Sequence, residues 1–78
     1  MTTPDKLLVT LLDAPRSASS LGAALHIPEL VAKANCERHR ANGLIDIAGI
    51  ADDGSTFYQL TPAGRQSAEA LKGSQLAL

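Results

Sequence analysis

Residues 17–64 read SASSLGAALHIPELVAKANCERHRANGLIDIAGIADDGSTFYQLTPAG, and this stretch decides how the chain folds. Its first half contains two helical segments that meet at a short turn, His26-Ile27, and the second segment closes at Asn42-Gly43. Its second half contains two apolar segments on either side of Asp52-Asp53-Gly54-Ser55. Because Asp-Gly is a strong signal for a hairpin turn, the stretch predicts a pair of helices followed by a β-hairpin.

Capping residues set the bounds of the two helices. Ser17 suits the N-cap of a helix over residues 18–25, because its hydroxyl can accept a hydrogen bond from a free backbone N–H. Pro28 begins the second helix, which runs to about Asn42. Gly43 then suits the left-handed conformation that commonly follows a helix. The two strands of the hairpin are predicted over residues 44–50 and 57–60.

One further helix is predicted on each side of this stretch. Residues 4–13 carry leucines with helical spacing, and Ala14-Pro15 stops the helix because the residue before proline disfavours the α region. Thr61 caps the last helix and Pro62 takes its first position. The sequence thus predicts one α+β domain over residues 1–78, in the order helix, helix, helix, hairpin, helix, with room for a short strand near Arg16.

The hairpin opens with Asn42-Gly43-Leu44-Ile45 and closes with Tyr58-Gln59-Leu60-Thr61-Pro62-Ala63-Gly64. These segments resemble the two ends of the wing in bacterial winged helix-turn-helix transcription regulators, the MarR-like and PadR-like groups among them. Ser17-Ala18-Ser19-Ser20-Leu21 resembles the start of the second helix in the same proteins. The resemblance implies a winged helix-turn-helix whose third helix enters the DNA major groove and whose wing tip touches the DNA backbone or the minor groove.

The third helix departs from the pattern of these families. Cys36 and His39 stand where the family patterns usually have large aliphatic residues, and Ala32 and Asn35 also face inward in that register. The opposite face carries a helical stripe that is mainly apolar. Either the helix is rotated from the family register or its outer face contacts protein. The stripe consists of Leu30, Ala34, Glu37 and Ala41.

The overall charge does not favour nucleic acid. Seven Lys and Arg residues against eight Asp and Glu residues give a net charge of −1, so any DNA affinity must come from a local patch. No Lys or Arg stands between Ala41 and Gly64, whereas Asp46, Asp52 and Asp53 do. An acidic wing is a poor clamp for phosphate.

The candidate DNA contacts lie on the third helix and at the start of the second. Lysine and arginine can neutralise phosphates, and arginine can bind the O6/N7 edge of guanine. Ser17 offers a phosphate contact at a helix N-terminus, and Glu29, Leu30 and Ala34 are expected to shape base recognition. The alternative is a solvated face of i,i+4 charge pairs, Glu29–Lys33 and Lys33–Glu37. The candidate set is Arg16, Ser17, Glu29, Leu30, Lys33, Ala34, Arg38 and Arg40.

Other kinds of site have little support. Cys36 and His39 have i,i+3 spacing, but a structural zinc site needs four ligands and the chain has one cysteine, so a buried thiol beside a partly buried imidazole is favoured. A redox switch at Cys36 would need a depressed pKa, to which Arg40 could contribute.

No catalytic motif is present, so neither enzyme activity nor a cofactor or metal is expected. No signal peptide or membrane-length apolar run is present either, so the protein is expected to be cytoplasmic.

Two functions follow from these patterns. The first is sequence-specific binding of double-stranded DNA in transcription regulation, by occupancy of a site and as a homodimer. The alternative is a winged-helix protein–protein interaction module with little or no DNA affinity. The interaction surface would then be the face of Leu30, Val31, Ala34 and Ala41, or the first and last helices.

Overall fold

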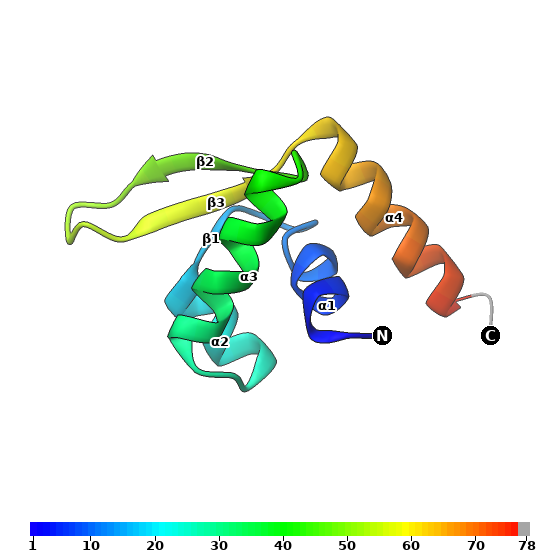
Figure 1. Cartoon of the computed structure of the whole chain (residues 1–78), viewed down its shortest axis with the longest axis horizontal. Coiled ribbons are helices and arrows are strands. Elements are labelled where there is room, and N and C mark those ends of the chain that lie inside the picture. Colours follow the sequence, from blue (N-terminus) through cyan, green and yellow to red (C-terminus); the bar gives the residue numbers. More distant parts are fainter. Residues whose placement is uncertain (77–78) are drawn as a thin grey trace.

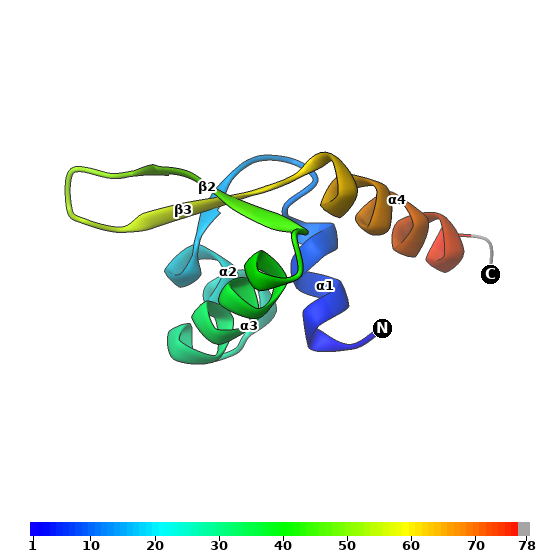
Figure 2. The same ribbon diagram turned by 45° about the horizontal axis from the view of Figure 1, so that its top comes forward.

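The helices lie beneath the base of a β-hairpin and beyond its end, and the tip of the hairpin projects away from them (Figures 1 and 2). The computed structural model describes residues 1–76, with side chains as far as Ser74. Within this range, none of the helices is both long and apolar enough to cross a lipid bilayer. The elements in chain order are α1 (Thr3–Thr10), β1 (Arg16–Ser17), α2 (Ala18–Leu25), α3 (Glu29–Ala41), β2 (Ile45–Ile50), β3 (Thr56–Leu60) and α4 (Pro62–Leu76).

The predicted α+β winged helix-turn-helix is confirmed, including the short strand near Arg16. The three strands are antiparallel in the order β1-β3-β2, so the hairpin gains a third strand from the segment before α2. The first helix ends earlier than predicted, at Thr10 rather than Asp13, because the Leu11 N–H already makes hydrogen bonds typical of a helix end. Leu11 nevertheless remains buried.

The predicted caps form as the sequence indicates. Ser17 Oγ accepts a hydrogen bond of 3.1 Å from the Ser20 N–H, and Thr61 Oγ1 accepts one of 3.0 Å from the Gly64 N–H. Gly43 has a φ of +77°, and its N–H donates to Arg40 while the Leu44 N–H donates to His39. This pair of hydrogen bonds is the Schellman motif, which turns the chain sharply from α3 into β2.

The core lies where α1, α2, α3 and the first half of α4 meet the base of the sheet. Its largest fully buried side chains come from four different elements, so that no helix buries its apolar face alone. Only Ile45 of β2 is buried, and the rest of that strand is exposed along the projecting part of the hairpin. The buried apolar residues are Leu7, Leu8, Leu11, Leu21, Ala32, Cys36, Ile45, Tyr58 and Ala68.

The hairpin carries an irregularity and a tight turn. Ile47 pairs with Tyr58 and Gly49 pairs with Phe57, which leaves Ala48 as an extra residue in β2, a β-bulge. At the tip, Gly54 has a φ of +89°, as the Asp-Gly turn predicts. Because bulges increase the local twist, the exposed edge of β2 is less suited to pairing with another strand.

Gly64 fixes the start of α4 against the turn after α3. A Cβ atom on Gly64 would overlap the carbonyl oxygen of Leu44 and lie 2.7 Å from its carbonyl carbon. We expect Gly64→Ala to lower the free energy of unfolding by about 2–3 kcal/mol, because the backbone must move to relieve this overlap. Urea unfolding of the full chain measures the change.

Gly73 provides the matched control, since it lies in the same helix and a Cβ there would meet nothing within 4 Å. Gly73→Ala should raise stability by up to about 1 kcal/mol through helix propensity. Equal effects of the two substitutions would contradict the role given to the close contact at Gly64.

Candidate nucleic-acid interface

The two faces of α3 have different surroundings. Ala32 and Cys36 are fully buried and His39 is 8% exposed, which confirms the inward face predicted from the sequence. Asn35 is half-buried, and its amide donates to the Val31 carbonyl at 3.0 Å. The candidate residues Leu30, Lys33, Ala34, Arg38 and Arg40 all lie on the exposed part of the helix. The register of α3 is therefore that of the winged-helix pattern, with small and polar residues on its inward face.

His39 is held on the inward face by a contact with the first helix. Its Nε2 donates to the Pro4 carbonyl oxygen at 3.0 Å, while its buried Nδ1 has no hydrogen-bond partner among the described residues. This contact ties the C-terminal part of α3 to the start of α1, which helps to fix which side of α3 faces outward.

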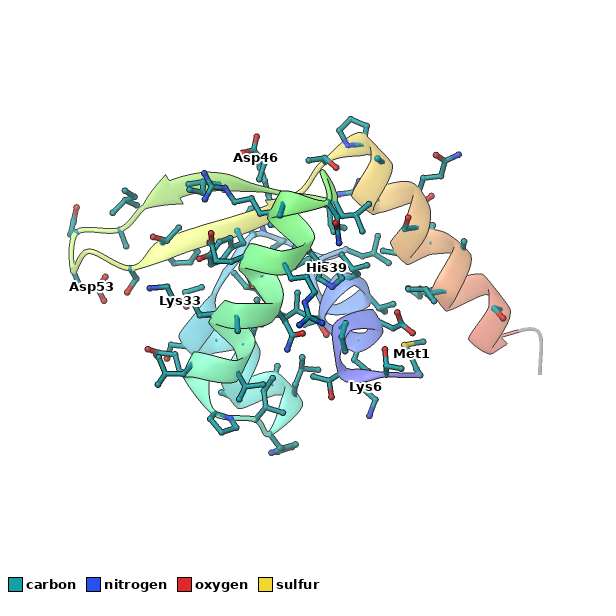
Figure 3. The ribbon with its side chains drawn as sticks, in the orientation of Figure 1. Met1, Lys6, Lys33, His39, Asp46 and Asp53 are labelled. Carbon is teal, nitrogen blue, oxygen red and sulfur yellow. The ribbon has the colours of Figure 1, made fainter. Side chains whose placement is uncertain are left out.

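The three cationic residues of α3 lie on two flanks of its exposed face. Lys33 and Arg40 are two turns apart on one flank, because seven residues complete about two helical turns. This flank faces the hairpin, and Figure 3 places Lys33 on that side. The helical period places Arg38 on the other flank. The cations thus lie on both sides of the outer face and do not form one cluster.

Two of the five charged side chains of α3 form an ion pair with each other. Arg40 Nη1 lies 3.2 Å from Glu37 Oε1, and this is the one ion pair in the described part of the chain. Neither of the predicted pairs, Glu29–Lys33 and Lys33–Glu37, is formed. The interpretation as a face of paired charges therefore applies only to Glu37 and Arg40, and it leaves Lys33 and Arg38 available.

Glu37 is directed toward the hairpin by a contact that the sequence does not reveal. Its Oε2 accepts a hydrogen bond of 2.9 Å from the hydroxyl of Tyr58 on β3, in addition to the ion pair with Arg40. Burial, followed by this hydrogen bond, raises the pKa of Tyr58 to about 12, so the phenol remains the donor at neutral pH. Both carboxylate oxygens of Glu37 are therefore engaged, one by the hairpin and the other by Arg40 of α3.

A polar hollow of about 220 Å³ lies between the start of α2, the first half of α3 and the hairpin. Ser17, Glu29 and Lys33, three of the predicted site residues, come together here. The hydroxyl-bearing residues of the hairpin were not predicted, since they become neighbours of α2 only when the sheet forms. The hollow is lined by Ser17, Ala18, Ser19, Glu29, Lys33, Gly54, Ser55, Thr56 and Tyr58.

Arg16 is less accessible than the sequence suggests. It is half-buried in β1, its Nη1 donates to Ser20 Oγ at 3.2 Å, and its Nε is buried without a hydrogen-bond partner among the described residues. The structure therefore ties this guanidinium to the first turn of α2 and does not bring it into the hollow with Lys33.

The hairpin is acidic and apolar rather than basic. Asp46, Asp52 and Asp53 are exposed, and hydrogen bonds from Ser55 hold the pKa of Asp53 below its usual value, so its carboxylate is ionised. Figure 3 shows Asp46 and Asp53 near opposite ends of the hairpin. Ile50 is 71% exposed and Ile47 is 37% exposed. The wing offers phosphate no cationic side chain.

The chain has the architecture of known regulators. No protein-family model and no curated protein matches it. The adhesin competence repressor AdcR of Streptococcus pyogenes superposes with a TM-score of 0.86 at 16% identity, over 96% of this chain and 57% of that one. NMB1585, a MarR family regulator of Neisseria meningitidis, superposes with a TM-score of 0.82 at 23% identity, over 96% of this chain and 54% of that one. A probable transcriptional regulator of Pseudomonas aeruginosa superposes with a TM-score of 0.84 at 29% identity, over 99% of this chain and 59% of that one.

These similarities establish the class of fold. The chain has the winged-helix fold that bacterial MarR-family regulators share, as the resemblance of its wing motifs predicted. It spans between 54% and 59% of the length of each of the three regulators.

Cys36 does not have the properties of a redox switch. It is fully buried, and burial together with the nearby Glu37 carboxylate raises its pKa to about 12, whereas a reactive thiol needs a lowered pKa. The described residues contain no group of three or more His, Cys, Asp and Glu side chains placed to hold a metal ion.

We expect the Cys36 thiol to resist alkylation in the folded protein. A pKa of about 12 in place of 9.0 lowers the thiolate fraction at pH 8 about a thousandfold, and burial slows the reagent further. Iodoacetamide labelling followed by mass spectrometry measures the rate, and the same chain in urea is the control. Comparable rates in the folded and unfolded chain would contradict the burial and the raised pKa.

Proposed function

We propose that this chain is a DNA-binding transcription regulator that recognises a sequence in double-stranded DNA and acts in the cytoplasm by occupying that site, without catalysis. The observation that carries the proposal is the outer face of α3, which is exposed along its length and has a cation on each flank. These cations, Lys33 and Arg38, form no ion pair with any acidic side chain of the described residues. The fold, shared with transcription regulators, supports the same conclusion by analogy.

The dimensions of α3 suit the major groove. Thirteen residues at about 1.5 Å each give a rod about 20 Å long, and the groove is about 12 Å wide, which admits a helix. A helix lying there has a phosphate backbone on each side. Lys33 would then neutralise phosphate on the hairpin side and Arg38 on the other, so their separation favours insertion between two strands.

The hollow beside α2 would add a backbone contact. Ser17 and Ser19 lie at the start of α2, where the helix dipole and free N–H groups favour an anion, and Lys33 lines the same hollow. Glu29 opposes phosphate there, so this contact would be a weak one. Arg16 would act indirectly, because its guanidinium is bonded to Ser20.

The remaining candidates would modulate recognition rather than supply charge. Arg40 is partly neutralised by Glu37, so its contribution to phosphate binding is small. Leu30 and Ala34 occupy the middle of the outer face, where side chains approach base edges. The acidic wing adds no cation, and the salt dependence of binding should therefore be shallow.

Dimerisation would place two copies of α3 in successive turns of the major groove. An apolar groove of about 470 Å³ lies between α1, α4 and the end of α3, and it is the surface that we propose for the homodimer. Two-fold operators with half-sites one helical turn apart are the usual targets of such dimers. The groove is lined by Asp5, Leu8, His39, Leu44, Ser67, Ala70, Leu71 and Ser74.

The composition of the hairpin favours a second candidate function. The wing exposes Ile47 and Ile50 beside aspartates and carries no Lys or Arg. Such a surface would suit a protein partner better than DNA. A protein-interaction module of this kind would have little or no affinity for duplex DNA. Measurement of DNA binding as a function of salt therefore separates the two candidates.

Charge reversal at Lys33 tests the DNA-binding proposal. We expect Lys33→Glu to lower affinity for a pool of randomised duplexes about tenfold or more, because it removes one phosphate contact and adds repulsion. The slope of log K against log salt should fall by about 1. Fluorescence anisotropy of the labelled pool, from low to physiological salt, measures both quantities.

Lys6→Glu is the control, since it makes the same change of charge on the exposed side of α1 (Figure 3). It should leave the affinity and slope near those of the original chain. Equal losses in the two variants would show a bulk charge effect and remove Lys33 from the interface. No binding of the unsubstituted chain to any duplex at low salt would favour the protein-interaction function.

A further inference from the structure

The most exposed large apolar side chain of the described residues lies on the helix that carries the cations. Leu30 is 78% exposed, and it is the second residue of α3. A single exposed leucine needs no explanation in general. Leu30, however, shares its side of the helix with Ala34 one turn further on, and that stripe lies between the flanks of Lys33 and Arg38. The arrangement is an apolar centre bordered by positive charges that have no ion-pair partner in the part of the chain that the structure describes.

This arrangement is complementary to one feature of DNA. Phosphates border the major groove on both sides. The base edges on its floor present hydrogen-bonding groups, and the one apolar substituent among them is the C5-methyl group of thymine. A leucine cannot hydrogen-bond to a base, so polar edges would lose their water without compensation if they faced it. A thymine methyl group is the base feature that gains from contact with Leu30.

The position of Leu30 within α3 favours such a contact. In helix-turn-helix proteins, the N-terminal residues of the recognition helix contact base edges. Leu30 lies in that first turn, and no other part of the described chain covers it. The small side chain of Ala34 lets the helix approach the groove floor closely. Glu37, which could otherwise accept a hydrogen bond from cytosine, is held by Tyr58 and Arg40.

We infer that Leu30 reads the C5-methyl group of thymine, so that the target site carries thymine opposite the first turn of α3. This inference rests on the proposed DNA-binding function and gives it a specific chemistry. Recognition at this position comes from burial of a methyl group and not from a hydrogen bond. It therefore discriminates thymine from uracil, which differ only in that group.

The experiment compares thymine with uracil in a duplex that the protein itself selects. The full chain selects bound sequences from a pool of randomised duplexes at low salt, and each thymine of the enriched sequence is then replaced singly by uracil. We expect one or two replacements to weaken binding about fourfold each, which corresponds to roughly 0.8 kcal/mol for one buried carbon group. The ratio of affinities for thymine and uracil at those positions is the readout.

Substituted variants show which side chain makes the protein prefer thymine to uracil. In Leu30→Ala the ratio at the sensitive positions should fall to about one. Ile50→Ala, which shortens a similarly exposed residue on the wing, should leave the ratio unchanged. Circular dichroism checks that each variant folds, and Leu30→Gln replaces Leu30→Ala where the latter is unstable. The ratio of affinities for thymine and uracil is also measured with the unsubstituted chain. That measurement tests the inference even where a variant fails to fold.

Two results would overturn the inference while leaving the proposed function intact. One is equal affinity of the unsubstituted chain for the selected duplex when uracil replaces every thymine. The other is an unchanged ratio in the folded Leu30 variant, which would move the methyl contact to another residue. If no duplex is enriched or bound at low salt, the proposed function fails together with this inference, and the face of Leu30 is better explained by a protein partner.

Discussion

The packing of one face of α3 against the other helices determines what the molecule presents to its surroundings. Ala32 and Cys36 are completely buried, and His39 is tied to Pro4 of α1. Rotation of the helix by one residue would move this stripe into solvent and bury charged side chains, which is energetically prohibitive without partners. The approach of α2 is equally restricted, since a Cβ on Gly22 would lie 2.8 Å from the Ile27 carbonyl oxygen. The outward direction of Leu30, Lys33 and Arg38 is a consequence of this packing.

The hairpin is fixed to α3 by contacts at its base, while its tip extends away from the helices. Tyr58 is buried and donates to Glu37, and the Schellman turn at Gly43 sets the direction in which β2 leaves the helix. Beyond these contacts β2 is exposed, and the extra residue at Ala48 increases the twist of the pair. The base of the wing therefore has a defined position relative to α3. The composition of the hairpin tip is free to vary, because the tip makes no contact with the core.

Most of the architecture was predictable because it depends on local signals. The caps at Ser17 and Thr61, the left-handed Gly43 and the Asp-Gly turn each act within a few residues. The buried face of α3 was assigned by the register of the winged-helix pattern that the sequence resembles, because the apolar stripe of this helix lies on the opposite face. The candidate site was less predictable, since its geometry depends on contacts between residues far apart in sequence. The hydrogen bond between Tyr58 and Glu37 joins residues that are 21 positions apart, and it redirects a carboxylate that helical spacing alone paired with Lys33. Arg16 is a second example, since this predicted DNA contact lies on the short strand β1, which pairs with β3, and its guanidinium donates to Ser20 Oγ.

The distribution of charge has a consequence for how such a protein would distinguish its target from other DNA. Non-specific affinity comes almost entirely from phosphate neutralisation. Here α3 carries only three Lys and Arg residues, one of which is paired with Glu37, the wing is acidic and the net charge is −1. What matters in a genome is the ratio of specific to non-specific binding rather than the affinity alone. A weak electrostatic contribution lowers both affinities together, whereas contacts with base edges, such as those available to Leu30, raise only the specific one. Two copies acting on adjacent half-sites would double the base contacts without adding a basic surface. An acidic wing and an apolar recognition surface are therefore compatible with selective DNA binding, provided that the base contacts supply the affinity that the phosphates do not.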